Sequence, residues 1–158
     1  MLMATVILIV STALLLFYLQ AVCGKILRRH FDEEYFLAIV NANRLEFPFV
    51  RQVVEEFDVP LEYARFRMQL KCDFLALTYL LKNAANARGR LTGQERLLVW
   101  YFRASFFALS VSHLAGRGER ASISKLTEIL QYFANEVGER VKQIRFGNLT
   151  ASDYLLSL

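Results

Sequence analysis

The chain has 158 residues, and its 19 Lys and Arg exceed its 15 Asp and Glu to give a net charge of +4. From Asp32 onward the excess falls to +1, because 16 Lys and Arg stand there against 15 Asp and Glu. A DNA- or RNA-binding domain concentrates cations on one element, so we expect no nucleic-acid partner. The two cysteines, Cys23 and Cys72, have no paired spacing, which excludes a disulfide framework.

The N-terminal segment is predicted to anchor the chain in a membrane. Its first 22 residues contain no charged side chain and no proline. About 20 apolar residues cross a hydrocarbon core of roughly 30 Å as a helix, so residues 1–24 are predicted to form a transmembrane anchor. Lys25, Arg28 and Arg29 follow directly, and an excess of Lys and Arg marks the cytoplasmic flank of a span. We therefore expect a single pass through a bacterial inner membrane, with the N-terminus outside and the rest of the chain in the cytoplasm.

This anchor is expected to be retained after synthesis. The run is longer than the apolar core of a secretory signal and lacks the charged start of one, which argues against cleavage. Residues 25–46 are predicted to extend the anchor as a juxtamembrane helical segment, with the helix unbroken through Phe31 to the acidic cluster at 32–34.

Residues 47–148 are predicted to form a compact bundle of four to five helices, which makes the chain all-α. Apolar residues recur there every three or four positions, as on the buried face of a helix. One short helix starts near Pro48, a long one covers residues 61–85, and another covers 122–146. Gly147 and Asn148 are expected to end the last of these, which leaves residues 149–158 as an apolar C-terminal tail.

A further helix is predicted over Leu97 to Ala115. Thr92 and Glu95 have the spacing of a capping box, in which each side chain satisfies the other's backbone N–H. The helix is apolar nearly all round, which indicates the middle of a bundle or a membrane. It is long enough for a second span, but Arg103 in its middle would cost about 2.5–3.5 kcal/mol on insertion scales. The helix before it is too charged to complete a membrane hairpin, so the bundle core is favoured.

The two central helices are predicted to pack as an antiparallel hairpin. With the turn near residues 88–89, Asp73 lies at the same height as Arg103. We therefore expect an ion pair between these two side chains at the border of the core.

The sequence contains few groups suited to catalysis or cofactor binding. Neither a phosphate-binding glycine loop, a nucleophile motif nor a paired metal-ligand spacing occurs, so we expect no enzyme and no cofactor. An enzyme that uses Asp73 is the remote alternative. His30 and His113 are the only histidines. His30 is expected to be an interfacial polar residue and His113 a hydrogen-bonded core histidine, although either type of position suits a haem or pigment ligand.

The aromatic content, 13 Phe, 7 Tyr and one Trp, suggests that part of the bundle forms an interface. The candidate docking residues are Phe47, Phe49, Tyr154, Leu155, Leu156 and Leu158. The function predicted is a non-catalytic accessory or scaffolding subunit, which associates with other membrane-complex subunits or with itself and with the lipid bilayer. The alternative is a cofactor- or lipid-binding membrane protein that uses His113 and the aromatic core around Trp100.

Overall fold

The computed structural model describes residues 2–29, 31, 35–56, 62–83, 91–114 and 120–156, without the side chains of residue 2 and residues 143–156. These residues form six α-helices and no strand, which confirms the predicted all-α class. The helices are α1 (Leu2–Leu27), α2 (Phe36–Asn43), α3 (Phe47–Glu56), α4 (Tyr63–Asn83), α5 (Gly93–Leu114) and α6 (Arg120–Leu156).

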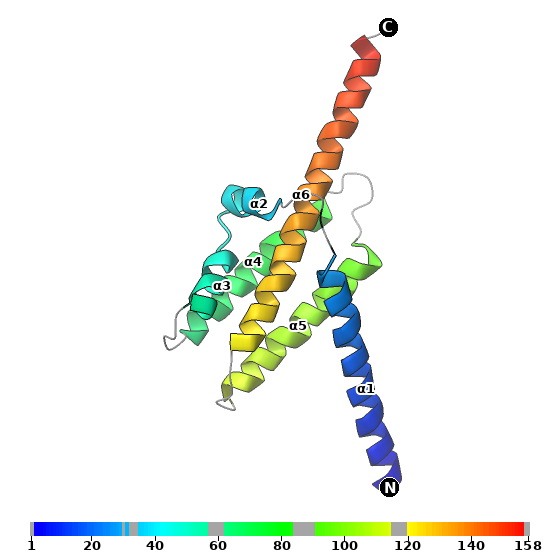
Figure 1. The fold of residues 1–158 in the computed structure, drawn as a ribbon, viewed down its shortest axis with the longest axis vertical. Helices are drawn as coiled ribbons and strands as arrows, with labels where there is room; N and C mark the ends of the chain where they lie inside the picture. Colours follow the sequence, from blue (N-terminus) through cyan, green and yellow to red (C-terminus); the bar gives the residue numbers. More distant parts are fainter. Residues whose placement is uncertain are drawn as a thin grey trace.

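Helix α6 is the centre of the fold. It packs against each of the other five helices, and Figure 1 shows it passing through the bundle and extending beyond it. Its buried residues recur at steps of three and four, as the sequence predicts, and a second row widens this face. The members of the first row are Ile123, Leu126, Leu130, Phe133 and Val137. The other helices therefore share one continuous apolar surface.

The C-terminal end of α6 differs from the prediction. The helix does not stop at Gly147 and Asn148 but continues to Leu156. One glycine inside a helix costs only about 1 kcal/mol relative to alanine, and this cost does not end the helix here. The apolar residues from Leu149 to Leu156 are consequently part of α6 and not a separate tail.

The segment after α1 also differs from the prediction. Helix α1 ends at Leu27, and Phe31 lies outside any helix. The Phe31 ring packs edge-on against Tyr132 of α6, with ring centroids 5.4 Å apart. This contact draws the chain away from the axis of α1 and toward α6. The predicted unbroken extension through Phe31 is therefore wrong, and His30 and the acidic cluster at 32–34 lie outside the described residues.

Helix α2 is attached to α6 at two points. The Asn135 side chain is buried and accepts the backbone N–H of Phe36 at 2.8 Å, which satisfies a donor at the start of α2. Gly138, one turn farther along α6, lets the chain approach closely. A Cβ atom at Gly138 would overlap the side chain of Tyr35, whose Cγ would lie 2.8 Å away. A glycine is therefore required at this crossing.

Helix α5 is less buried than the sequence predicts. One of its faces packs in the core through Leu98, Tyr101, Phe102 and Leu109. Its opposite face exposes large apolar side chains, including Trp100, which is 69% exposed. The helix in the middle of the bundle is α6, so the predicted central burial of α5 is wrong.

Helices α4 and α5 run antiparallel in the predicted register. The rings of Phe74 and Phe102 are stacked with centroids 4.0 Å apart, and those of Tyr63 and His113 with centroids 3.7 Å apart. These pairs lie at the heights that the hairpin argument assigns to them. Two helices, α1 from Met3 and α5, are long and apolar enough to cross a membrane. Only 6% of the apolar window of α1 is buried in the protein, against 22% of that of α5.

Candidate functional site

The predicted ion pair between Asp73 and Arg103 does not form. Asp73 is 5% exposed, and its Oδ2 accepts the backbone N–H of Glu46 at 2.9 Å and of Phe47 at 2.6 Å. The carboxylate thus caps the first turn of α3 from another helix. Arg103 lies on the exposed face of α5. Both residues are at the predicted height, but their side chains point into different surroundings.

Burial dominates the electrostatics of Asp73. Desolvation raises the pKa of its carboxyl above the ordinary value, and the two backbone N–H groups counteract this rise only in part. The raised pKa has a structural explanation in the capping role, so the remote hypothesis of an enzyme that uses Asp73 gains no support from it.

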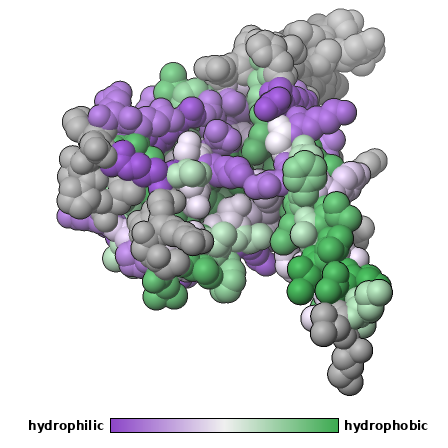
Figure 2. Space-filling model, turned by 60° about the horizontal axis from the view of Figure 1, so that its bottom comes forward, coloured by the Kyte–Doolittle hydropathy of each residue, from purple (hydrophilic) through white to green (hydrophobic). Residues whose placement is uncertain are grey.

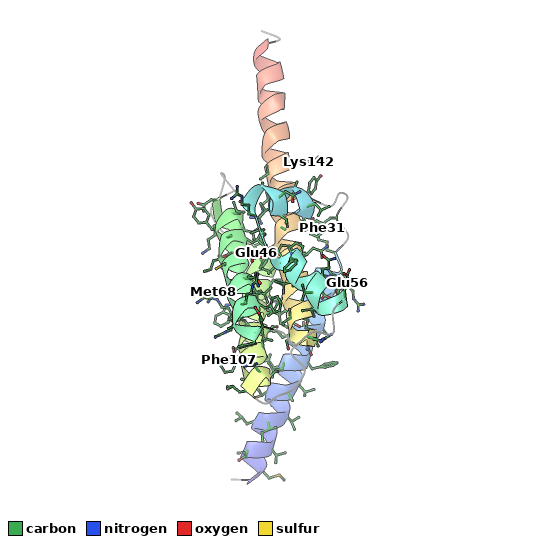
Figure 3. All side chains as sticks on the ribbon, turned by 90° about the vertical axis from the view of Figure 1, so that its left-hand side faces the viewer. Phe31, Glu46, Glu56, Met68, Phe107 and Lys142 are labelled. Atoms are coloured by element: carbon green, nitrogen blue, oxygen red, sulfur yellow. The ribbon has the colours of Figure 1, made fainter. Side chains whose placement is uncertain are left out.

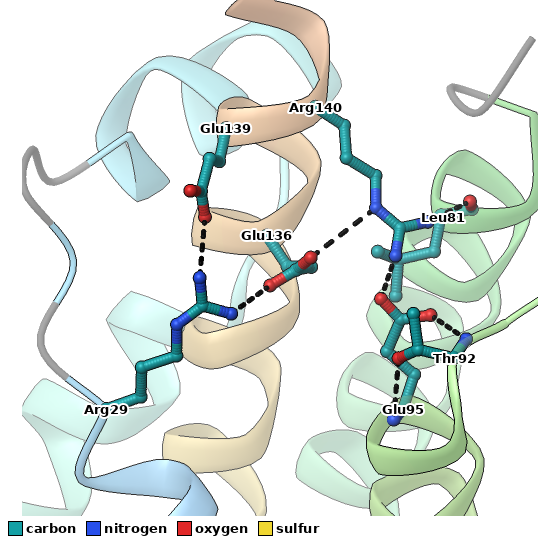
Figure 4. Close-up of polar contacts among 7 residues, drawn as sticks. All are labelled: Arg29, Leu81, Thr92, Glu95, Glu136, Glu139 and Arg140. Carbon is teal, nitrogen blue, oxygen red and sulfur yellow. Dashed lines mark hydrogen bonds and ion pairs between the residues drawn. The ribbon is translucent and has the colours of Figure 1, made fainter. Parts of the chain in front are cut away.

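A chain of charged side chains crosses α6 and connects α1 to α5 (Figure 4). Arg29 pairs with Glu136 at 3.4 Å and with Glu139 at 3.5 Å. Arg140 pairs with Glu136 at 3.5 Å, with Glu95, and with the backbone oxygen of Leu81 at 3.0 Å. The charges alternate in sign along the chain, so each interior member has opposite partners on both sides.

Glu95 is the most buried member of this chain, at 1% exposed. Its Oε2 accepts the backbone N–H of Thr92 at 2.8 Å, and the Thr92 hydroxyl accepts the backbone N–H of Glu95 at 3.3 Å. The predicted capping box is therefore confirmed. The second partner of Glu95, Arg140, lies 45 residues later in the chain, so no local sequence pattern indicates it.

The same chain of charges affects the pKa of Glu136 and the pKa of Arg29. Burial, followed by the nearby Glu95 charge, raises the pKa of Glu136, and Arg140 and Arg29 oppose this rise. A hydrogen bond with the Tyr132 side chain is the main factor that raises the pKa of Arg29. Arg29, predicted only as a topology signal together with Lys25 and Arg28, therefore also connects the end of α1 to α6.

His113 is not the buried core histidine that the sequence predicts. It is exposed, and its ring is stacked on Tyr63 with an interplanar angle of 2°. Trp100 is also exposed and does not line an apolar core, which removes the basis for the alternative ligand site around both residues. Across the described parts of the chain, no group of three or more metal-ligating side chains occurs. His30 is not among the described residues.

The predicted docking residues have different positions. Phe47 is 2% exposed and belongs to the core, so its assignment to a docking surface is wrong. Phe49 is 55% exposed. Tyr154, Leu155 and Leu156 lie in the last turns of α6, whose side chains are outside the described set, and Leu158 is outside it altogether. Of these six residues, Phe49 alone is described as an exposed side chain.

A larger exposed apolar surface lies on α4 and α5. We call it the outer face, and its residues are Met68, Leu75 and Tyr79 of α4 and Trp100, Phe107, Val111 and Leu114 of α5. Figure 3 shows Met68 and Phe107 on the same side of the molecule, and in Figure 2 apolar surface lies along α1 and again on the underside of the bundle. Exposed large apolar side chains gathered on neighbouring helices are typical of a binding site for another protein or a membrane.

Cations border the outer face. Lys71 of α4 and Arg103 of α5 are exposed there, and the Arg67 guanidinium lies 5.4 Å from the ring centroid of Phe106. The sequence did not reveal this surface because α5 has apolar residues on two sides. The spacing of such residues is the same whether they contact the rest of the protein or face outward.

Comparison with known proteins gives no match, whether against protein-family models, curated proteins or solved structures.

Proposed function

We propose that the protein is a non-catalytic, membrane-anchored accessory or scaffolding subunit of a bacterial inner-membrane protein complex, and that its partner docks on the outer face. The observation that carries the proposal is the exposure of Trp100 and Phe107 on α5, at 69% and 70%. Helix α5 contacts α1, an apolar helix that is itself almost uncovered by the rest of the protein. Aromatic side chains of this kind are enriched at protein interfaces.

Helix α1 is the proposed single span. All its side chains from Met3 to Tyr18 are exposed, so no part of the bundle covers them. The Thr12 hydroxyl donates to the backbone oxygen of Leu8 at 2.8 Å, which satisfies this polar group within the helix, as lipid requires. Lys25 and Arg28 are exposed at its C-terminal end, where they suit the cytoplasmic surface.

Helix α5 is the proposed docking helix and not a second span. It carries buried Glu95 on its inner face and exposed Arg103 in the middle of its outer face, and both are unfavourable in lipid. In Figures 1 and 3 its C-terminal end lies nearer the level of the N-terminal part of α1 than its start does. A subunit in the same membrane can therefore contact α1 and the outer face together.

The border of the outer face indicates the chemistry of the partner. Arg103 lies between Trp100 and Phe107 on α5, and Lys71 and Arg67 lie on α4, so positive charge stands among and beside the apolar side chains. Complementary interfaces bring opposite charges together at the rim. The proposed partner thus presents an apolar helix face with acidic residues at its edges.

Purification in mild detergent tests this function. We expect wild-type protein to co-purify with other membrane subunits at a fixed ratio, and Phe107→Ser to reduce their recovery about tenfold or more, as expected for a central aromatic contact. Leu37→Ser is the control, because Leu37 is more than half exposed and lies on α2. If the wild-type protein emerges alone, or Leu37→Ser has the same effect as Phe107→Ser, the proposal is wrong.

The native cysteines provide a test of orientation. Cys72 is exposed on α4 and Cys23 is buried, so Cys72 is the site that reacts in the folded protein. We expect a membrane-impermeant maleimide to label the protein in inverted membrane vesicles and not in intact spheroplasts. Cys72 lies beside the outer face, where a bound partner would shield it from the reagent. The protein should therefore be produced in excess of its partner.

The variant Cys72→Ser is the control for this labelling and is expected to remain unlabelled in both preparations. Labelling of the wild-type protein in spheroplasts would reverse the proposed orientation.

A further inference from the structure

A cavity of about 610 Å³ lies where the end of α1 meets the bundle. Residues from α1, α3, α5 and α6 line it, together with Phe31. This volume is within the range of sites for small organic ligands, and it is far larger than a single inorganic ion needs.

The wall of the cavity carries more cations than acids. Arg28, Arg29, Arg51 and Lys125 line it, and Glu128 is the one carboxylate on its wall. Arg29 and Arg51 pair with glutamates outside the wall, so the cations that would favour an anionic ligand are Arg28 and Lys125.

Two of these cations are held in place by neighbours. Arg29 pairs with Glu136 and Glu139, and Arg51 pairs with Glu55 at 2.9 Å and donates to Gln131 at 2.7 Å. These contacts already use both terminal nitrogens of Arg29 and two of the three nitrogens of Arg51, so the two side chains shape the wall of the cavity and do not supply its free charge.

The other two cations are available. Arg28 and Lys125 are exposed, and within the described ranges neither forms an ion pair. Arg28 directly follows α1 and Lys125 lies on α6, and both are on the wall of one cavity. The charge that could neutralise them is therefore expected to come from a bound anion.

Helix α1 turns one face toward this cavity. Gln20, Gly24 and Leu27 line it at helical spacing, just after the exposed apolar part of the helix. A Cβ at Gly24 would meet nothing within 4 Å, so the glycine leaves this space open. Tyr101 and Leu27 add apolar surface beside the cations, which suits an amphipathic ligand.

We infer that this cavity binds the headgroup of an acidic membrane lipid, with the available cations Arg28 and Lys125 as the groups that attract its phosphate. The choice of a lipid rests on the proposed role of α1 as anchor, because the cavity then lies at the cytoplasmic surface of the bilayer. Basic pockets at this level are suited to anionic headgroups, and a glycerol backbone can lie along Leu27 and Tyr101.

Lipid binding can be measured on the full-length protein in detergent. Delipidated protein is titrated with phosphatidylglycerol or phosphatidylcholine of the same acyl chains, and native mass spectrometry counts the bound lipids. We expect one phosphatidylglycerol to bind at least about tenfold more tightly than phosphatidylcholine, because roughly fivefold is gained per nearby cation. Equal binding of the two lipids would overturn the inference.

Two kinds of variant separate the cavity from general surface charge. Arg28→Gln combined with Lys125→Gln is expected to weaken phosphatidylglycerol binding about 25-fold. Lys71→Gln combined with Lys82→Gln removes two exposed cations of α4 and should leave binding unchanged. Gly24→Leu keeps every charge but narrows the cavity at α1, so it should weaken phosphatidylglycerol binding. Wild-type binding by Gly24→Leu would exclude the cavity.

Soluble competitors identify the source of the phosphate. Glycerol phosphate and inorganic phosphate are expected not to displace phosphatidylglycerol at equal concentration. Displacement by either would overturn the assignment to a lipid in favour of a soluble phosphate. These measurements need neither a partner subunit nor a defined orientation, so their failure is distinguishable from failure of the proposed function.

Discussion

Replacing Glu95 with alanine is expected to lower the free energy of unfolding by about 3–5 kcal/mol, the range found when one partner of a buried ion pair is removed. Glu95 is 1% exposed, and Arg140 opposite it keeps only 14% of its side chain exposed. Without Glu95 the guanidinium stays buried beside Glu136 and the Leu81 oxygen alone. The start of α5 also loses its capping box, because the N–H of Thr92 no longer has an acceptor.

The comparison variants separate these two contributions. Glu95→Gln keeps an oxygen for the N–H of Thr92 and removes only the charge, so its loss should be smaller. Glu62→Ala removes a carboxylate that is 72% exposed and is expected to change the free energy by less than about 0.5 kcal/mol. Urea unfolding of the detergent-solubilised protein, followed by circular dichroism, measures all three. A loss below about 1 kcal/mol for Glu95→Ala would contradict a buried, paired carboxylate.

Replacing Asp73 with alanine is the second large change, with an expected loss of about 2–4 kcal/mol. The substitution strands two backbone donors, the N–H groups of Glu46 and Phe47, at the start of α3. Asp73→Asn retains an acceptor oxygen and should recover much of the loss. Arg103→Gln, at the partner that the sequence predicted, should be nearly neutral because Arg103 is exposed. The same unfolding experiment measures these variants. A large loss of unfolding free energy for Arg103→Gln would support the predicted ion pair between Arg103 and Asp73.

The pH dependence of the Asp73 variants has a definite sign. Burial raises the pKa of Asp73 in the folded protein above its value in the unfolded chain. Folding therefore favours the protonated carboxyl, and this contribution is fully present below about pH 4 and is lost as the pH rises through the folded pKa. The stability of wild type relative to Asp73→Asn should decline from pH 4 toward neutrality. The comparison with Asp73→Asn is needed because Glu136, whose pKa is also raised, titrates in both proteins.

Local patterns in the sequence predicted most of the helices correctly. The capping box of Thr92 and Glu95 involves residues three positions apart, and its geometry follows from helix structure alone. The stacking of Phe74 on Phe102 follows from the antiparallel register of two neighbouring helices. In these cases the partners are close in sequence or related by one turn.

The contacts that hold the helices together were not predictable in this way. The antiparallel register of α4 and α5 places Asp73 level with Arg103. It does not specify toward which side of α4 the Asp73 carboxylate points or which donor binds it. That donor belongs to α3, 26 residues earlier, and the partner of Glu95 lies 45 residues later on α6. The apolar outer face of α5 was mistaken for core because its composition does not distinguish a protein neighbour from an external one.

The position of α6 has a consequence for the order in which the protein matures. Among the six described helices, the one that contacts all the others is made last, and its 37 residues take about 2–7 s to synthesise at 5–20 residues per second. Helices α2 to α5 lack their common packing surface until α6 is made. For the proposed anchor α1, insertion into a membrane would therefore precede completion of the bundle.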